Sequence, residues 1–144
     1  MKRIVSVGMT MPLLFSSCVS VGHQSQAAKG IKNADTICIV PHPQTREGFQ
    51  RAMEAWLEHR NYKVNVLPVG SNISDCAWSL TYSGEWSWDW SIYLADAEII
   101  AYHNGTQVGK SEFNAPGGIF NFNPKKWGSA DTRVQEMMNR LFEK

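Results

Sequence analysis

The chain has 144 residues, a formal net charge of +1 and 43% hydrophobic residues, which is enough apolar material for one domain with a real core. No stretch is strongly basic, and Lys125-Lys126 is the nearest approach to one, so the electrostatic footprint of a nucleic-acid-binding protein is missing. Six tryptophans are more than packing alone would need in a chain of this length.

The N-terminus has the pattern of a lipoprotein signal peptide. Two basic residues precede the apolar stretch Ile4–Phe15, and two serines separate that stretch from Cys18. This order predicts cleavage before Cys18 and acylation of the new N-terminal cysteine by chains such as palmitate. The alternative is a plain secretory peptide with an incidental cysteine. The apolar run is well short of the roughly 20 residues that a spanning helix needs. We therefore expect residues 1–17 to be removed.

The residues after Cys18 predict where the mature protein resides. Val19 stands where aspartate would be the usual signal for retention in the inner membrane. The expected place is the inner leaflet of the outer membrane, where the N-terminal lipid is the membrane contact and the domain lies in the periplasm. Residues 18–33 hold Ser, Gln, Gly and Lys without apolar periodicity, which predicts a flexible tether, and residues 34–144 are expected to form a single domain.

The first part of the domain is predicted to be a strand-helix-strand unit. Thr36–Val40 is a short β-branched run of the kind found in buried strands. Between Thr45, the expected N-cap, and Arg60 the apolar residues recur at helical spacing. They are Phe49, Met53, Trp56 and Leu57. Tyr62–Val69 predicts a second strand, which should run parallel to the first because a helix connects them.

An antiparallel run of strands is predicted next. Apolar and small residues alternate from Cys76 to Leu94, which is too long for one flat strand. A bulge or a break is therefore expected near Ser83-Gly84 or Leu94-Asp96. Ala97–His103 should be a further strand. The dipeptide Asn104-Gly105 is the strongest hairpin signal in the chain, and Thr106–Asn114 should return antiparallel after it.

A loop, a short edge strand and a helix should complete the domain. The loop follows Ala115, and the edge strand is expected over Ile119–Phe122. Ser129 or Asp131 should cap a helix with an apolar stripe. The stripe comprises Val134, Met137, Met138 and Leu141. The order β-α-β-β-β-β-α predicts an α+β fold, a two-layer sandwich of a mostly antiparallel sheet and two helices.

Five short segments of the domain share a pattern with other proteins. They are Asp75–Tyr82, Trp88-Asp89, Tyr93–Glu98, Gly105–Gly109 and Lys125–Trp127. At these scattered positions the sequence resembles a group of small Gram-negative envelope lipoproteins of uncharacterised function. The resemblance covers most of the mature domain and implies an envelope lipoprotein with a compact α/β domain. It implies no catalytic residue.

Cys38 and Cys76 are an even pair once Cys18 is lipidated, and both would face an oxidising periplasm. A disulfide between them requires neighbouring strands with Cα atoms within about 7 Å. The alternative is two buried thiols that pack as small hydrophobic side chains.

Trp86, Trp88 and Trp90 occupy alternate positions, so a strand would place the three indoles on one face. Facing the helices, they would be core. Facing solvent, they would form a stacking surface for sugar rings or an apolar contact for a partner. We predict that Trp88 is buried against the helix that bears Trp56, while Trp86 or Trp90 stays partly exposed as the candidate binding surface.

No catalytic or metal-binding pattern is recognisable. The four histidines lack metal-ligand spacing, and there is no Cys-x-x-Cys, nucleophile elbow or phosphate-binding motif. We therefore expect no enzyme activity, no cofactor and no metal.

The leading hypothesis is a non-enzymatic periplasmic lipoprotein whose domain binds another envelope component, either a protein or peptidoglycan. One alternative is a saccharide- or peptidoglycan-recognition module that uses Trp86 and Trp90. Another is an inhibitor or immunity-type lipoprotein, which would require a protruding loop such as Ala115–Asn123.

Overall fold

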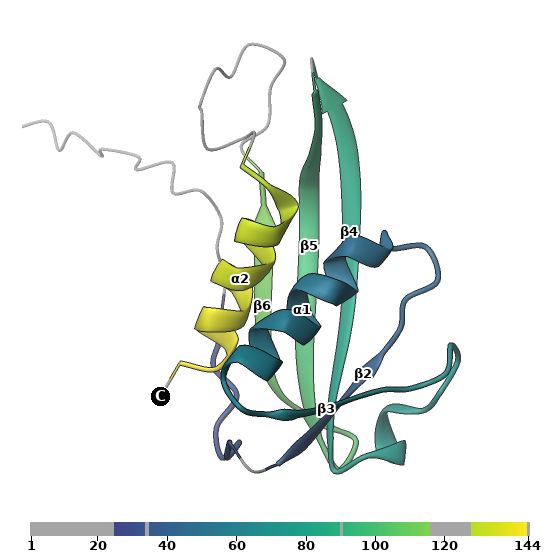
Figure 1. The fold of residues 1–144 in the computed structure, drawn as a ribbon, viewed down its shortest axis with the longest axis vertical. Helices are drawn as coiled ribbons and strands as arrows, with labels where there is room; N and C mark the ends of the chain where they lie inside the picture. Colours follow the sequence, from purple (N-terminus) through teal and green to yellow (C-terminus); the bar gives the residue numbers. More distant parts are fainter. Residues whose placement is uncertain (1–24, 34, 90, 116–127, 144) are drawn as a thin grey trace, which may run out of the picture.

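The computed structural model describes residues 25–33, 35–89, 91–115 and 128–143. They form a six-stranded sheet with two helices packed on one face (Figure 1). The predicted two-layer α+β fold is confirmed, although the sheet is mixed rather than purely antiparallel. Among these residues no helix is both long and apolar enough to cross a membrane.

The helices and strands from residue 36 onward occur in the order that the sequence predicts. The strands are β1 (Ser25–Gln26), β2 (Thr36–Val40), β3 (Lys63–Val66), β4 (Trp78–Asp89), β5 (Ser91–His103) and β6 (Thr106–Asn114). The helices are α1 (Glu47–His59), α2 (Ala130–Leu141) and the short 3-10 turn η1 (Ile73–Asp75). The strands lie in the order β1-β6-β5-β4-β2-β3. β2 is parallel to both β3 and β4, and the other neighbours are antiparallel.

The predicted strand-helix-strand unit is formed by β2, α1 and β3, with parallel strands. The N-cap of α1 is Arg46, whose side chain makes no capping bond, so the prediction of Thr45 as the cap is wrong by one residue. The Thr45 hydroxyl instead accepts a hydrogen bond from the Gly84 N–H at 3.2 Å and bonds to Nδ1 of His42 at 2.9 Å. It therefore fastens the loop before α1 to β4.

The long alternating run belongs to two strands rather than one. β4 and β5 pair antiparallel, with Asp89 opposite Ser91, so β5 begins well before the predicted start at Ala97. Alternation continues through both strands with the same period and therefore does not mark where the chain reverses. The predicted bulge is present at Ala95, because the partners shift from Glu85–Asp96 to Trp86–Leu94.

The Asn104-Gly105 hairpin is confirmed. His103 pairs with Thr106, which leaves a two-residue turn. Asn104 and Gly105 both have positive φ, 49° and 78°. A two-residue turn with two positive φ angles suits the twist of the strands it joins, and Asn-Gly is the dipeptide that adopts it most readily.

The domain begins earlier than composition predicts. β1, within the segment assigned to a tether, pairs antiparallel with β6. Ala28 is buried, and its N–H donates a hydrogen bond to the Leu141 carbonyl oxygen at 2.7 Å. A Cβ at Gly109 would lie 2.7 Å from the Ala28 nitrogen, so only glycine lets this segment approach. The segment is held by backbone hydrogen bonds to β6. Apolar periodicity in the sequence does not indicate such bonds, so the sequence did not predict this strand.

The core lies between the helices and the sheet. Both predicted helical stripes are buried, with Ser129 as the N-cap of α2. The residues fully buried on the helices are Phe49, Met53, Leu57, Val134, Met137, Met138 and Leu141. The sheet offers Ile37, Ile39, Leu80, Leu94 and Ile99 to the same core.

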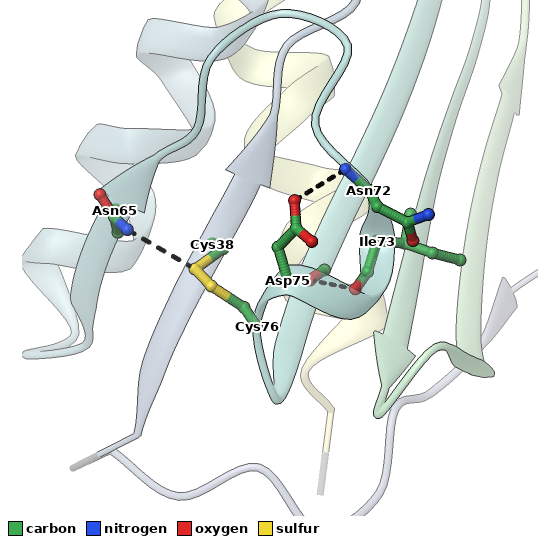
Figure 2. Close-up of a disulfide and its surroundings, with 7 residues drawn as sticks. Cys38, Asn65, Asn72, Ile73, Asp75 and Cys76 are labelled. Carbon is green, nitrogen blue, oxygen red and sulfur yellow. Dashed lines mark hydrogen bonds between the residues drawn. A yellow bond between two sulfur atoms is a disulfide. The ribbon is translucent and has the colours of Figure 1, made fainter.

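The predicted disulfide between Cys38 and Cys76 is confirmed, with the Cα atoms 6.3 Å apart (Figure 2). Cys38 lies in β2, and Cys76 lies just before β4, the parallel neighbour of β2. A reciprocal pair of hydrogen bonds between Asn72 and Asp75 shapes the 3-10 turn that delivers Cys76. The geometric condition set out from the sequence is therefore met.

Loss of this disulfide should lower the free energy of unfolding by about 4 kcal/mol, because its 38-residue separation restricts the unfolded chain. Urea unfolding of wild type and of the Cys38→Ala/Cys76→Ala double variant measures the difference. Mass spectrometry after alkylation without reductant should find both thiols blocked. Alkylation of both cysteines in the native, unreduced protein would contradict the bond.

Candidate interaction surfaces

The free end of the β4–β5 hairpin carries two exposed large apolar side chains. Trp88 is 72% exposed and Ile92 is 55% exposed. They are directly opposite each other in the antiparallel ladder, so their side chains share one face of the sheet. Both strands run on past the N-terminal end of α1 (Figure 1). The pair, called here the Trp88–Ile92 tip, lies on the helix-bearing face but beyond the helix.

Trp86 lies two residues earlier on the same face and does contact the helix layer. Its ring meets Phe49 edge-on with centroids 6.4 Å apart, and the Arg46 guanidinium carbon lies 5.2 Å from its centroid. Phe49 in turn stacks on Tyr82, with centroids 5.2 Å apart. Burial raises the pKa of Tyr82, whose hydroxyl donates to Gln50 at 3.1 Å. Trp86 is thus partly buried, as expected of an outer member of the Trp run.

The prediction that Trp88 is buried against the helix bearing Trp56 is wrong. Trp56 lies near the C-terminal end of α1, where it packs with Tyr62 and Phe142. Trp88 lies beyond the other end of that helix. The sequence pattern gives the face of the sheet on which an indole lies, but it does not give how far the helix extends along the strand.

On the opposite face of the sheet, Lys110 lies between two carboxylates. Glu98 and Glu112 are direct cross-strand partners, and the Lys110 ammonium lies 2.6 Å from a carboxylate oxygen of each. Hydrogen bonds to Glu112 and Glu98 raise the pKa of Lys110 above its ordinary value. Nearer the hairpin tip Glu85 pairs with Asp96, which accepts a hydrogen bond from Asn114.

An open hollow of about 1070 Å³ adjoins these carboxylates and also contacts side chains from the start of α1. Its lining includes His42, Arg46, Glu85, Trp86, Asp96 and Glu112. The hollow is a mixed-charge surface, in contrast to the apolar tip beyond it.

A second cluster joins the C-terminal ends of the two helices. The Trp56 indole N–H and the Arg60 guanidinium both donate to Oδ1 of Asn139, at 2.9 and 2.7 Å. The Arg60 guanidinium carbon lies 3.9 Å from the centroid of the Trp56 ring. Burial raises the pKa of Tyr62, which stacks on Trp56. These contacts give the cluster a structural role, because they connect the C-terminal ends of α1 and α2.

His42 and His103 take part in separate structural contacts. His42 bonds to Thr45, and His103 stacks on Trp78 with centroids 4.1 Å apart. Within the ranges that the structure covers, no three His, Cys, Asp or Glu side chains are placed to hold a metal ion. Several predictions concern residues outside those that the structure describes. These residues are the lipidation residue Cys18, the indole Trp90, the predicted edge strand 119–122 and the 115–123 loop after its first residue.

The fold defines the chain as an α+β domain with a mixed sheet covered on one face, and the same fold is found in PelC. The PelC dodecamer from Paraburkholderia phytofirmans in space group P6 matches with a TM-score of 0.58 and 10% identity, over 83% of this chain and 98% of that chain. A variant PelC dodecamer from the same organism in space group C2 gives 0.57 and 10%, over 83% and 94%. No protein-family model and no curated protein matches the chain. The likeness to PelC is one of fold alone.

Replacing Trp88 by alanine should change the free energy of unfolding by less than about 0.5 kcal/mol, because most of the side chain is already in solvent. The matched variant Trp56→Ala should cost about 3–5 kcal/mol, because that indole is buried. Urea unfolding of both variants tests the contrast. A Trp88→Ala loss as large as that of Trp56→Ala would mean that the tip is packed.

Lys110→Met should lower the melting temperature at pH 7, because Glu98 and Glu112 would then face each other without their cation. Since the pKa of Lys110 is raised in the folded state, its ion pairs stabilise the fold below the unfolded-state pKa of lysine, while the carboxylates are ionised. The loss should shrink below about pH 4 and at about 1 M salt. Lys63→Met, at an exposed lysine of β3, is the control. A loss independent of pH and salt would refute the electrostatic account.

Proposed function

We propose that this protein is a lipid-anchored, non-enzymatic protein of the cell envelope whose domain binds another envelope component through the Trp88–Ile92 tip. The acylated residue would be Cys18, and the anchor would lie in the inner leaflet of the outer membrane. The domain would then face the periplasm, where the Cys38–Cys76 disulfide is stable.

The exposed tip is the observation that carries this proposal. Trp88 and Ile92 are adjacent, each is more than half exposed, and both lie at the end of a projecting hairpin. Scattered single apolar side chains are ordinary on a protein surface, but a contiguous apolar spot favours a contact site. An indole beside a branched aliphatic side chain supplies a rigid apolar contact at small entropic cost.

A second candidate is saccharide or peptidoglycan recognition, with Trp88 rather than Trp86 as the stacking indole. The exposure of Trp88 favours it, since a free ring face is what a sugar ring stacks on. Trp86 suits that role less well, because Phe49 and Arg46 already contact its ring. Contact with a second copy of this chain is a further outcome that the crosslinking experiment below can detect, because the PelC proteins of the same fold are dodecamers.

Lipidation is tested by labelling cells with a fatty-acid probe. Wild type should be labelled and should partition with membranes, whereas Cys18→Ala should be unlabelled and should accumulate as uncleaved precursor. An unlabelled wild type would refute the anchor.

The contact surface is tested by a photo-crosslinking residue at position 88 of the full lipoprotein in cells. Val69, which is 64% exposed away from the hairpin, is the matched control position. Position 88 should give a discrete adduct that position 69 does not give, and Ile92→Asp should abolish it. Mass analysis distinguishes a protein, a glycan and a second copy of this chain. Equal crosslinking at the two positions would refute the proposed contact surface.

A further inference from the structure

We infer that the Trp88–Ile92 tip docks on the lipid surface of the same membrane that holds the acyl anchor. This inference rests on the proposed function and names the envelope component that the tip contacts. Two independent features carry it, namely the direction in which the chain enters the sheet and the chemistry of the tip.

β1 enters the sheet from the side of the tip. β6 runs away from the Asn104-Gly105 turn and toward the tip, because its last residue, Asn114, pairs with Asp96 of β5. β1 is antiparallel to β6. The N-terminal end of β1, at Ser25, therefore points toward the end of the sheet where Trp88 and Ile92 lie.

The length of chain before β1 matches the distance to the tip. Ser25 pairs with Ser111, and Ser111 pairs with Ile99. Ile92 lies seven residues before Ile99, with one bulged residue between them, which is about 20 Å along the strand. With two strand spacings of about 4.8 Å, the diagonal from Ser25 to Ile92 is about 22 Å.

Ser25 lies seven positions after Cys18, and seven Cα–Cα steps reach at most about 25 Å. An acyl group on Cys18 and the tip can therefore lie at the same membrane surface. The short reach also keeps the domain at that surface once the lipid is inserted.

The chemistry of the tip fits the interfacial layer of a bilayer. Tryptophan is enriched where headgroups meet acyl chains, because its ring is apolar and its N–H is polar. Arg46, the cation stacked on Trp86, is available to anionic headgroups from the same face of the sheet. Glu98 and Glu112 project from the other face of the sheet, and they line the far side of the hollow that Arg46 also lines.

The far end of the sheet differs from the tip in its turn residues. It carries the Asn104-Gly105 turn and the hydrogen-bonded pair Asn72 and Asp75. With the acyl chains inserted in the membrane, an interfacial side-chain contact would fix the orientation of the domain. The apolar end and the end nearest the anchor are thus the same end.

The test uses the mature, acylated protein in vesicles of phosphatidylethanolamine and phosphatidylglycerol. Cys38 and Cys76 are bonded, so an introduced cysteine takes an environment-sensitive fluorophore selectively. The label is placed at Ile92→Cys, with Trp88 intact, or at Thr106→Cys, an exposed position at the far end of the sheet. Lipids brominated near the headgroup should quench the label at position 92 and leave the label at position 106 unquenched. Adding Trp88→Ser should remove most of the quenching at position 92.

The other possible results of the quenching and crosslinking experiments each refute a particular claim. If neither label is quenched on vesicle-bound protein while position 88 still crosslinks to a protein or glycan, the lipid inference fails and the proposed contact surface stands. Equal quenching at positions 92 and 106 refutes the orientation. If neither label is quenched and position 88 gives no adduct, both claims fail. If Cys18 carries no acyl group, the anchor and the inference that depends on it fail together.

Discussion

The length of the β4–β5 ladder relative to the helix that covers it is the constraint on which the rest of the structure depends. A 12-residue strand spans about 40 Å, whereas the 13 residues of α1 span about 20 Å. The two helices cover most of the inward-facing positions of this ladder, and the outermost pair, Trp88 and Ile92, is left in solvent. Phe49 marks the boundary, since Trp86 contacts it and Trp88 lies beyond it.

The ladder is anchored on both sides at its covered end. The disulfide ties β2 to the entry of β4, and β1 closes the opposite edge against β6. On the uncovered face, charged partners such as Lys110 and Glu98 replace apolar ones, which an antiparallel sheet tolerates because alternate side chains face water. The disulfide lies toward the end of the sheet opposite the tip, and the tip itself is exposed.

The sequence predicts those features that depend on local periodicity or on turn chemistry. The stripe of α2 and the Asn104-Gly105 turn follow from such patterns, whereas the disulfide between Cys38 and Cys76 also required that β2 and β4 be neighbours. The exposure of Trp88 and the role of β1 do not follow from such patterns, because each depends on an element distant in sequence. The exposure of Trp88 depends on where α1 begins, because Trp88 lies beyond the N-terminal end of that helix. Ser25–Gln26 is held by pairing with the backbone of β6. The periodicity of a strand indicates which face of the sheet a side chain occupies. Whether a helix buries that side chain depends on the tertiary structure.

The correction at Trp88 changes what the Trp run means for function. With Trp88 in the core, its side chain would have been explained by packing alone. As an exposed pair with Ile92, Trp88 lies at the end of the sheet that the N-terminal end of β1 faces, so the proposed lipid anchor and the apolar tip would act from one side. The carboxylates around Lys110 occupy a different face of the sheet. A domain held at a membrane by its tip would thus present that charged face sideways to the periplasm.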